Sequence, residues 1–477
     1  MSPLVVNQLG KRSPHRRTLI ISFILGSLLL GLTLFALGVG RAGGHSVLSV
    51  WQLLPFGIVG LISWGTWLMR WVGSRWYQPT INNFRTTTSV VVPSYREDPD
   101  ITIRCLESWL SENPDEIIMV VDVADVKVLE RLRAFEHDER LRVIPFEHRG
   151  KRSALGVGIR AAKHEILILT DSDTSWEKGL VTAVQMPFVD PSVGGVSTRQ
   201  NAILRDSSIW RVIADWLVNI RYLDYVPIEG MFGGVACLSG RTAAYRRAAV
   251  LNVVDHLEHE YFMGKECVAG DDGRLTWLIL GSGYKTVYQS TARAWSMFPN
   301  ELRAFIKQRI RWSRNSYRCY ITSIKEGWLW RQPLVTQIRV FQILLTPFSQ
   351  GFALLFLSLL VWQQNWTYVA LGLAWVLIGR GIRSLSHFWE NPRDIYLLPI
   401  VALVVIGVAF PIKIWAFFTM NTHGWLTRHE TSVGGEGQTE ASLYVVPELL
   451  QDDVKGLTTE QRLRFLKSHP ELQEVHS

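Results

Sequence analysis

Hydrophobic residues follow two different patterns along this chain. Near the N-terminus and in the last third they form long apolar runs, whereas residues 86–300 hold short apolar runs separated by helical stretches. A helix needs about 20 apolar residues to cross the hydrocarbon core of a bilayer. Short apolar runs alternating with helices are typical of a mostly parallel sheet covered on both faces. The pattern therefore predicts an α/β domain set between membrane segments.

The two N-terminal runs span residues 18–40 and 47–69. Basic residues lie before the first run and after the second, and Arg41 alone lies between them. The positive-inside rule places the N-terminus and everything after Arg70 in the cytoplasm. A cleaved signal peptide is disfavoured, because the first run is too long and a second follows at once. We therefore expect a basic N-terminus over residues 1–17 and two transmembrane helices within 18–72.

Within the middle stretch, apolar runs predict strands at residues 89–93, 116–123, 141–146 and 165–170. Helices are expected at 98–110, where Asp98 can cap the first turn, and at 126–135 and 149–163. Residues 302–320 form a basic amphipathic pattern with interleaved Trp and Tyr. We interpret 301–330 as a helix at the membrane surface.

The last third holds further apolar runs at residues 335–362, 366–378 and 395–420. Arg380, Arg383 and Arg393 place the loop between the last two runs in the cytoplasm. If all three runs cross the membrane, the C-terminal tail lies on the non-cytoplasmic side. The tail stays in the cytoplasm if the run at 395–420 breaks near Pro411, or if Pro347 interrupts the run at 335–362. We expect spanning or interfacial helices over 331–420 and a cytoplasmic tail over 421–477, polar from residue 432 and helical near 459–467.

Composition agrees with a membrane protein, since only 19% of residues are charged and 20 are Trp. The 50 basic and 42 acidic residues give a net charge of +8. The basic surplus flanks the apolar runs, as an anionic inner leaflet favours, and no nucleic-acid-binding motif is present. We expect a lipid bilayer as partner and no nucleic acid. Four widely spaced cysteines predict free thiols: Cys105, Cys237, Cys267 and Cys319.

Candidate chemistry begins with Asp171-Ser172-Asp173, which ends the strand predicted at 165–170. Ligands of open α/β sheets bind at the carboxyl ends of strands, and two carboxylates there suit Mg²⁺ or Mn²⁺ carrying a diphosphate. An Asp-x-Asp pair is weak evidence by itself. Polar residues at other strand ends add to it: Tyr95, Glu97, Asp122 and Lys151.

Lys151 opens the helix that follows Gly150, where a helix N-terminus and a cation together favour an anion. No Gly-x-Gly-x-x-Gly follows the first strand and no Walker motif is present, which argues against a dinucleotide oxidoreductase or a P-loop ATPase. Asp271-Asp272, between glycines, suits a general base held beside a second carboxylate that raises one of the two pKa values. Gln308-x-x-Arg311-Trp312 offers an arginine for a diphosphate and an indole for a sugar face.

Taken together, these motifs resemble the membrane-embedded synthases of glycosyltransferase family 2, which make hyaluronan, chitin and cellulose. The resemblance covers residues 90–312, and the stretch from Cys267 to Thr276 is most similar to the hyaluronan synthase branch. The chain departs from that branch in its second strand, at Gly273, and at Arg241, where hyaluronan synthases tend to have proline. Residues 424–428 resemble the Trp-Gly-Thr-Arg motif of that branch.

The resemblance implies a GT-A-type α/β domain joined to transmembrane helices, in the plasma (inner) membrane. It implies a processive, inverting synthase that uses UDP-sugars and Mn²⁺ or Mg²⁺ and exports a growing polysaccharide. Asp173 and Asp171 would hold the metal, and Asp272, beside Asp271, would act as base. The remaining roles implied are UDP binding by Tyr95, Glu97, Asp122, Lys151, Asp171 and Arg311, and acceptor binding by Trp312, Gln308, Gly240 and Ser239. The alternatives are a transferase that adds one sugar to a lipid, and a non-enzymatic export component. The donor sugar stays open.

Overall fold

The computed structural model describes residues 58–147 and 149–422. The apolar run at 18–40, the first part of the run at 47–69 (residues 47–57), the motif at 424–428 and the expected helix at 459–467 lie outside the described residues. Within them, the helices predicted in the α/β stretch are present as α4 (Pro99–Leu110), α5 (Val126–Leu132) and α6 (Lys151–Ala161). Asp98 caps α4 as expected, accepting hydrogen bonds from the backbone N–H groups of Asp100 and Ile101.

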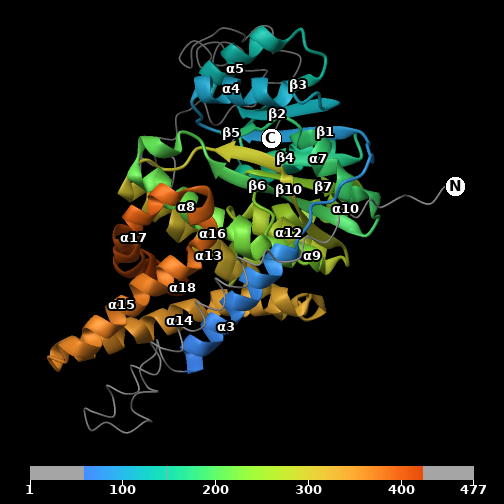
Figure 1. Cartoon of the computed structure of the whole chain (residues 1–477). Coiled ribbons are helices and arrows are strands. Elements are labelled where there is room, and N and C mark those ends of the chain that lie inside the picture. The colour runs from blue at the N-terminus through green and yellow to red at the C-terminus, as the bar shows by residue number, and fades with distance from the viewer. Residues whose placement is uncertain (1–57, 148, 423–477) are drawn as a thin grey trace.

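An eight-stranded sheet forms the centre of the described part of the chain, in the order β3-β2-β1-β4-β7-β6-β10-β5 (Figure 1). The four predicted strands are present, and each pairing between two of them is parallel. The strands are β1 (Thr88–Ser94), β2 (Glu116–Asp122), β3 (Leu141–Phe146), β4 (Ile166–Thr170), β5 (Thr174–Trp176), β6 (Val193–Ala202), β7 (Thr242–Arg246) and β10 (Lys285–Ser296).

The sheet is mixed, with four parallel and three antiparallel strand pairs. β7 runs antiparallel to both of its neighbours, β4 and β6, and β5 runs antiparallel to β10. β7 has the sequence Thr-Ala-Ala-Tyr-Arg, which is too short and too poor in large apolar residues to be predicted as a strand. It reaches the centre of the sheet only after the chain has passed through α8 (Ile209–Ile220) and α9 (Val226–Met231).

Helices cover both faces of the sheet, as predicted. Successive residues of β1 point to opposite sides: Val91 packs in a core with α6, α8 and α12 (Asp271–Gly281), whereas Val90 and Val92 pack with α4, α5 and α7 (Leu180–Gln185). All three valines are fully buried. The two buried faces explain why these strands read as continuous apolar runs instead of alternating ones.

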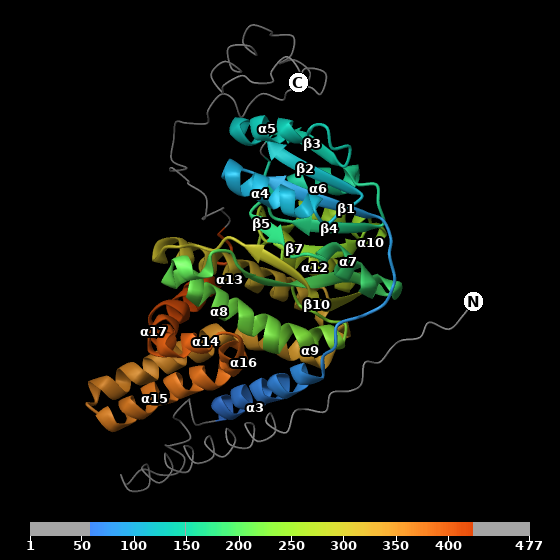
Figure 2. The same ribbon diagram turned by 45° about the horizontal axis from the view of Figure 1, so that its top comes forward.

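Apolar helices extend from one side of this domain (Figure 2). They are α3 (Ile58–Gly73), α14 (Leu334–Trp362), α15 (Trp366–Arg383), α16 (Leu385–Glu390), α17 (Leu398–Val404) and α18 (Phe410–Phe418). Two helices in the described residues are long and apolar enough to cross a membrane, Leu334–Trp362 and the continuous helix Pro392–Phe418. Only 11% and 22% of their apolar windows are buried, so most of this apolar surface faces outward.

Three local expectations about these helices were wrong. Arg380 and Arg383 lie in the last turn of α15 and not in a loop, because the helix continues past the apolar run. Pro347 does not interrupt α14, which is helical throughout. Pro411 does not end the last helix either. A π-helical turn over Val405–Ala409 precedes it, and such a turn accommodates the backbone carbonyl that proline leaves without a partner.

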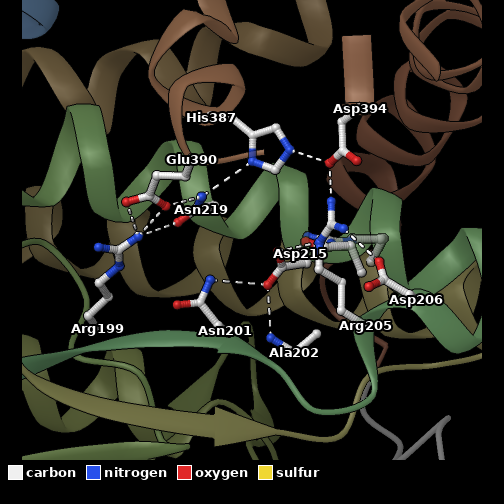
Figure 3. Close-up of polar contacts among 12 residues, drawn as sticks. Arg199, Asn201, Ala202, Arg205, Asp206, Asp215, Asn219, His387, Glu390 and Asp394 are labelled. Atoms are coloured by element: carbon white, nitrogen blue, oxygen red, sulfur yellow. Dashed lines mark hydrogen bonds and ion pairs between the residues drawn. The ribbon is translucent and has the colours of Figure 1, made fainter. Parts of the chain in front are cut away.

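A polar network joins the C-terminal helices to the sheet domain (Figure 3). Fully buried His387, on α16, stacks on Trp216 of α8, and its Nε2 lies 2.7 Å from Asp394 Oδ2. Arg205 contacts Asp394 and also lies 3.1 Å from Asp215 of α8. Glu390, which ends α16, accepts hydrogen bonds from Arg199 of β6 and Asn219 of α8. These contacts fix the start of the last apolar helix against the domain.

Candidate functional site

A cavity of about 260 Å³ lies at the carboxyl ends of the central strands. Residues from five parts of the chain line it, which places most of the predicted site residues around one space. They are Tyr95 after β1, Asp122 at the end of β2, Lys151 at the start of α6, Asp171 and Asp173 after β4, and Gln308 and Arg311 on α13 (Leu302–Lys325). The structure therefore brings together most of the residues predicted at the strand ends, whereas Glu97 does not reach the cavity.

Lys151 joins two carboxylates that are far apart in the chain. Its Nζ lies 2.7 Å from Asp171 Oδ1 and 3.0 Å from Asp271 Oδ2. Burial lowers the pKa of Lys151, but the two carboxylates outweigh it and hold the pKa above its usual range. Lys151 thus couples the end of β4 to the start of α12. We predicted from sequence that it faces a nucleotide, but not that two carboxylates already engage it.

The two adjacent carboxylates of α12 differ in their environments. Burial and the charge of Asp271 raise the pKa of Asp272. Burial acts in the same direction on Asp271, but Lys151 outweighs it and lowers the pKa of Asp271. Asp272 Oδ1 accepts a hydrogen bond of 2.7 Å from the N–H of Gly273. Asp272 is therefore the better proton acceptor of the pair, in agreement with the expected splitting.

The segment before β7 lies against this pair. The Gly240 N–H is 3.5 Å from Asp272 Oδ2, and a side-chain carbon at Gly240 would stand 3.3 Å from both Asp271 Oδ2 and Lys151 Nζ. Glycine at this position allows the backbone to approach the carboxylates closely. Ser239 is half-buried beside it and lies outside the lining of the large cavity.

Five further predicted residues also lie outside that lining. Gly240, Asp271 and Asp272 line a smaller pocket that shares Lys151 and Asp171 with the large cavity. Glu97 and Trp312 line neither.

Glu97 accepts a 3.0 Å hydrogen bond from Ser172 Oγ and so supports the loop between Asp171 and Asp173. The guanidinium carbons of Arg241 and Arg309 lie 4.9 and 4.8 Å from the ring centroid of Trp312. Two cations thus flank the indole of Trp312.

Sequence reasoning missed the role of Arg152, which is 4% exposed. Its Nη2 donates to Glu260 Oε2 at 2.7 Å and to the carbonyl oxygens of Ala269 and Gly270 at 3.0 and 3.3 Å. These two carbonyls directly precede Asp271. Arg152 therefore anchors the loop that leads to the paired carboxylates. In the sequence, the only indication of this role is that Arg152 directly follows Lys151.

Two protein carboxylates could coordinate a metal ion here, those of Asp171 and Asp173. Across the described ranges, no group of three or more His, Cys, Asp or Glu side chains is placed to hold a metal ion. Mg²⁺ is commonly bound by one or two carboxylates, with phosphate oxygens and water completing the shell. The donor set therefore fits a metal that arrives with a diphosphate ligand.

Comparison with known proteins now assigns the domain. Residues 85–315 match the family model described as "Glycosyltransferase like family 2". The chain carries a family 2 glycosyltransferase domain. This glycosyltransferase is 27% identical over 358 residues to an N-acetylglucosaminyltransferase of Azorhizobium caulinodans, covering 72% of this chain and 87% of that protein. It is 25% identical over 445 residues to a hyaluronan synthase of Streptococcus pyogenes, covering 88% of this chain and 99% of the synthase.

A solved structure supports the fold. The mannosyltransferase of Pyrobaculum calidifontis in complex with GDP-Man and Mn²⁺ superimposes with a TM-score of 0.54 at 19% identity, over 75% of this chain and 98% of that one. The glycosyltransferase therefore has the expected GT-A-like α/β fold, with a mixed sheet.

Proposed function

We propose that this glycosyltransferase is a processive, inverting synthase that polymerises sugars from UDP-sugar donors on the cytoplasmic side and exports the product through its membrane helices. The observation that carries the proposal is the position of α13. One side of this helix supplies Gln308 and Arg311 to the cavity, and another side packs against α18 of the apolar helix Pro392–Phe418. A chain growing at the cavity thus starts next to the membrane helices.

In this proposal, Asp173 and Asp171 hold Mn²⁺ or Mg²⁺, which when bound neutralises charge on the diphosphate. Arg311 adds a cation for the same group, and Lys151 keeps Asp171 in place. Tyr95 and Asp122 complete the nucleotide side of the cavity, and Glu97 supports that side from behind through its hydrogen bond from Ser172. Trp312, Gln308, Ser239 and Gly240 form the acceptor side, next to Asp272.

Asp272 takes the proton from the acceptor hydroxyl as that oxygen bonds to the anomeric carbon of the donor sugar. The bond from the anomeric carbon to the diphosphate oxygen breaks, and UDP leaves with the electron pair. One base without a carboxylate nucleophile opposite it implies a single displacement, which inverts the anomeric centre. An α-linked UDP-sugar then yields a β-glycoside.

The membrane part of the proposal rests on three observations. Most of the apolar surface of α14 and of the helix Pro392–Phe418 faces outward. The sequence adds apolar runs at 18–40 and 47–69, with basic residues before the first and after the second, which is the charge pattern that the positive-inside rule associates with cytoplasmic ends. The hyaluronan synthase relative aligns over 99% of its own length, which includes the stretches outside the transferase domain.

The test uses the purified full chain in lipid with Mn²⁺ or Mg²⁺. UDP-sugars are supplied singly and in pairs, and both UDP release and product length are measured. A polymer supports the proposal, whereas a single sugar on a lipid acceptor would establish the non-processive alternative. Asp272→Asn should lower UDP release at least about 100-fold while UDP binding persists. Asp206→Asn, at a side chain 86% exposed, is the matched control and should keep full activity.

A further inference from the structure

A π-helical turn over Arg221–Tyr225 joins α8 to α9. These two helices lie between the sheet and the apolar helices α3 and α16 (Figure 2). The Val226 N–H bonds to the carbonyl of Arg221, five residues back, and Pro227, which has no N–H to donate, follows in the next turn. Single π-turns inside helices often occur at functional sites. This turn contacts the site on one side and the apolar helices on the other.

On the side of the site, Arg221 contacts the stretch Cys237–Gly240, which precedes β7 and belongs to no helix or strand. We call this stretch the acceptor segment, because Ser239 and Gly240 are on the proposed acceptor side. Arg221 Nη2 donates a 2.6 Å hydrogen bond to the carbonyl oxygen of Cys237. A carbonyl outside regular structure needs a partner from elsewhere, and a charged donor is a strong one. Arg221 therefore fixes the start of the acceptor segment.

The acceptor segment lies against the proposed base along its length. Cys237 Sγ is 3.9 Å from Asp272 Oδ2, and the Gly240 nitrogen is 3.5 Å from the same oxygen. Between them, the Leu238 N–H donates to Thr276 Oγ1 at 2.9 Å, and that hydroxyl donates to the carbonyl of Asp272 at 2.7 Å. A displacement of the acceptor segment would therefore move an acceptor hydroxyl relative to Asp272.

Arg221 also acts on the base through its charge. Burial and the charge of Asp271 raise the pKa of Asp272, whereas the charges of Lys151 and Arg221 act in the opposite direction. Lys151 is held by Asp171 and Asp271, but Arg221 comes from a different part of the chain. A substitution of Arg221 therefore removes a hydrogen bond to the acceptor segment and a charge near the base.

The other end of the π-turn is fixed by the apolar helices. Asp224, which is 1% exposed, accepts a 2.5 Å hydrogen bond from Ser386 Oγ of α16 and lies 3.7 Å from Arg75 Nη2, just after α3. The guanidinium carbon of Arg70, on α3, lies 5.1 Å from the centroid of the Tyr225 ring. These contacts hold the turn from the membrane side and so keep Arg221 in place.

We infer that Arg221 is a positioning residue for the acceptor: it holds the acceptor segment against Asp272 through the carbonyl of Cys237. The inference rests on the proposed function and extends its acceptor side to a residue outside the cavity. Arg221 lines neither the large cavity nor the smaller pocket beside it. Transfer depends steeply on the position of the attacking hydroxyl. Loss of Arg221 should therefore impair use of the acceptor and leave binding of the nucleotide unchanged.

The first measurement compares Arg221→Met with Arg247→Met in the purified full chain in phosphatidylcholine vesicles. Arg247, on α10 (Arg247–Leu251), also donates one hydrogen bond to a backbone carbonyl, that of Ala162 at 2.7 Å, but it lies at the opposite end of β7 from the acceptor segment. UDP release is measured with the UDP-sugars that support polymer formation, and a short oligosaccharide cut from that polymer serves as acceptor.

For Arg221→Met, kcat/KM for the acceptor should fall at least about tenfold, while KM for the UDP-sugar stays unchanged. Arg221→Lys, which keeps a charged donor, should recover most of the activity. Arg247→Met should match the unaltered chain in both parameters. Hydrogen–deuterium exchange tests the contact without any substrate: the amides of Leu238 and Gly240 should exchange at least about fivefold faster in Arg221→Met, and at the unaltered rate in Arg247→Met.

Two results would overturn the inference. One is unchanged exchange at Leu238 and Gly240 in Arg221→Met, whether or not the chain makes polymer. The other is an equal loss of affinity for the UDP-sugar and the acceptor, which would indicate general damage to the site. If the unaltered chain transfers no sugar from any UDP-sugar, the proposed function fails, and the exchange rates still decide whether Arg221 holds the segment. If Arg221→Met does not fold, Arg221→Gln takes its place, with the same expected results.

Discussion

Substitution of Arg152 by methionine tests whether the loop before α12 is held by a single buried side chain. Methionine keeps most of the length and apolar volume but removes the guanidinium. The change deletes the ion pair with Glu260, the bonds to the carbonyls of Ala269 and Gly270, and a 3.1 Å bond from Nη1 to the carbonyl of Leu257. Glu260 is left buried, with Arg274 at 3.4 Å as its remaining cation.

The magnitude follows from this environment. Removing one partner of a buried ion pair typically costs about 3–5 kcal/mol, because the other charge stays buried. Arg274 offsets part of this, so we expect a loss of about 3 kcal/mol in the free energy of unfolding. For a domain of this size, that corresponds to a fall of about 10 °C in melting temperature. The catalytic rate should fall as well, because the released loop carries Asp271 and Asp272.

Two measurements separate an effect on protein stability from an effect on the positioning of Asp271 and Asp272. Thermal melts of the full chain in detergent give the melting temperature, and UDP release well below it gives kcat and KM. We expect kcat to fall at least about tenfold, with little change in the affinity for UDP. Arg142→Met, at an exposed position on β3, is the control and should change stability by less than about 0.5 kcal/mol.

Arg152→Met combined with Glu260→Met should be less destabilising than the sum of the two single changes, since the pair acts together. A melting temperature and kcat equal to those of the Arg142→Met control would refute the anchoring role. Strict additivity in the double variant would show that the ion pair does not contribute.

Three further outcomes follow from the site. The acid limb of the pH profile of kcat should lie above the usual carboxyl range, because the pKa of Asp272 is raised, and Asp271→Asn should move that limb to lower pH by removing the neighbouring charge. Burial raises the pKa of Asp224 to about 6, so its neutral form is favoured in the folded protein. The contribution of Asp224 to stability should then be fully present below the unfolded pKa near 3.8 and should fall by up to about 3 kcal/mol as pH rises through 6, a component of the pH dependence that urea titrations of Asp224→Asn should lack. Chelation of divalent cations should abolish UDP release, and Mn²⁺ or Mg²⁺ should restore it in the unaltered chain but not in Asp173→Ala; full activity after chelation would exclude the metal role.

The sequence was sufficient for the parts of the fold that depend on local pattern. β1 to β4 are buried on both faces and therefore appear as short continuous apolar runs, and Asp98 marks the start of α4 through its own side chain. It was not sufficient for β7, whose small residues pack in the sheet centre without an apolar signature. Nor could it give the end of α15, because arginines can continue a helix that hydrophobic pattern alone would end.

The same division holds for the site. The sequence by itself determined that Tyr95, Asp122, Lys151 and Asp171 meet, because the carboxyl ends of neighbouring parallel strands share one edge of a sheet. Only the tertiary structure decided that Lys151 joins Asp171 to Asp271, and that it thereby separates the pKa values of Asp271 and Asp272. It also decided that Arg241 and Arg309 flank the ring of Trp312. These properties depend on distances between side chains from different elements and on their burial, neither of which is encoded in any local stretch of sequence.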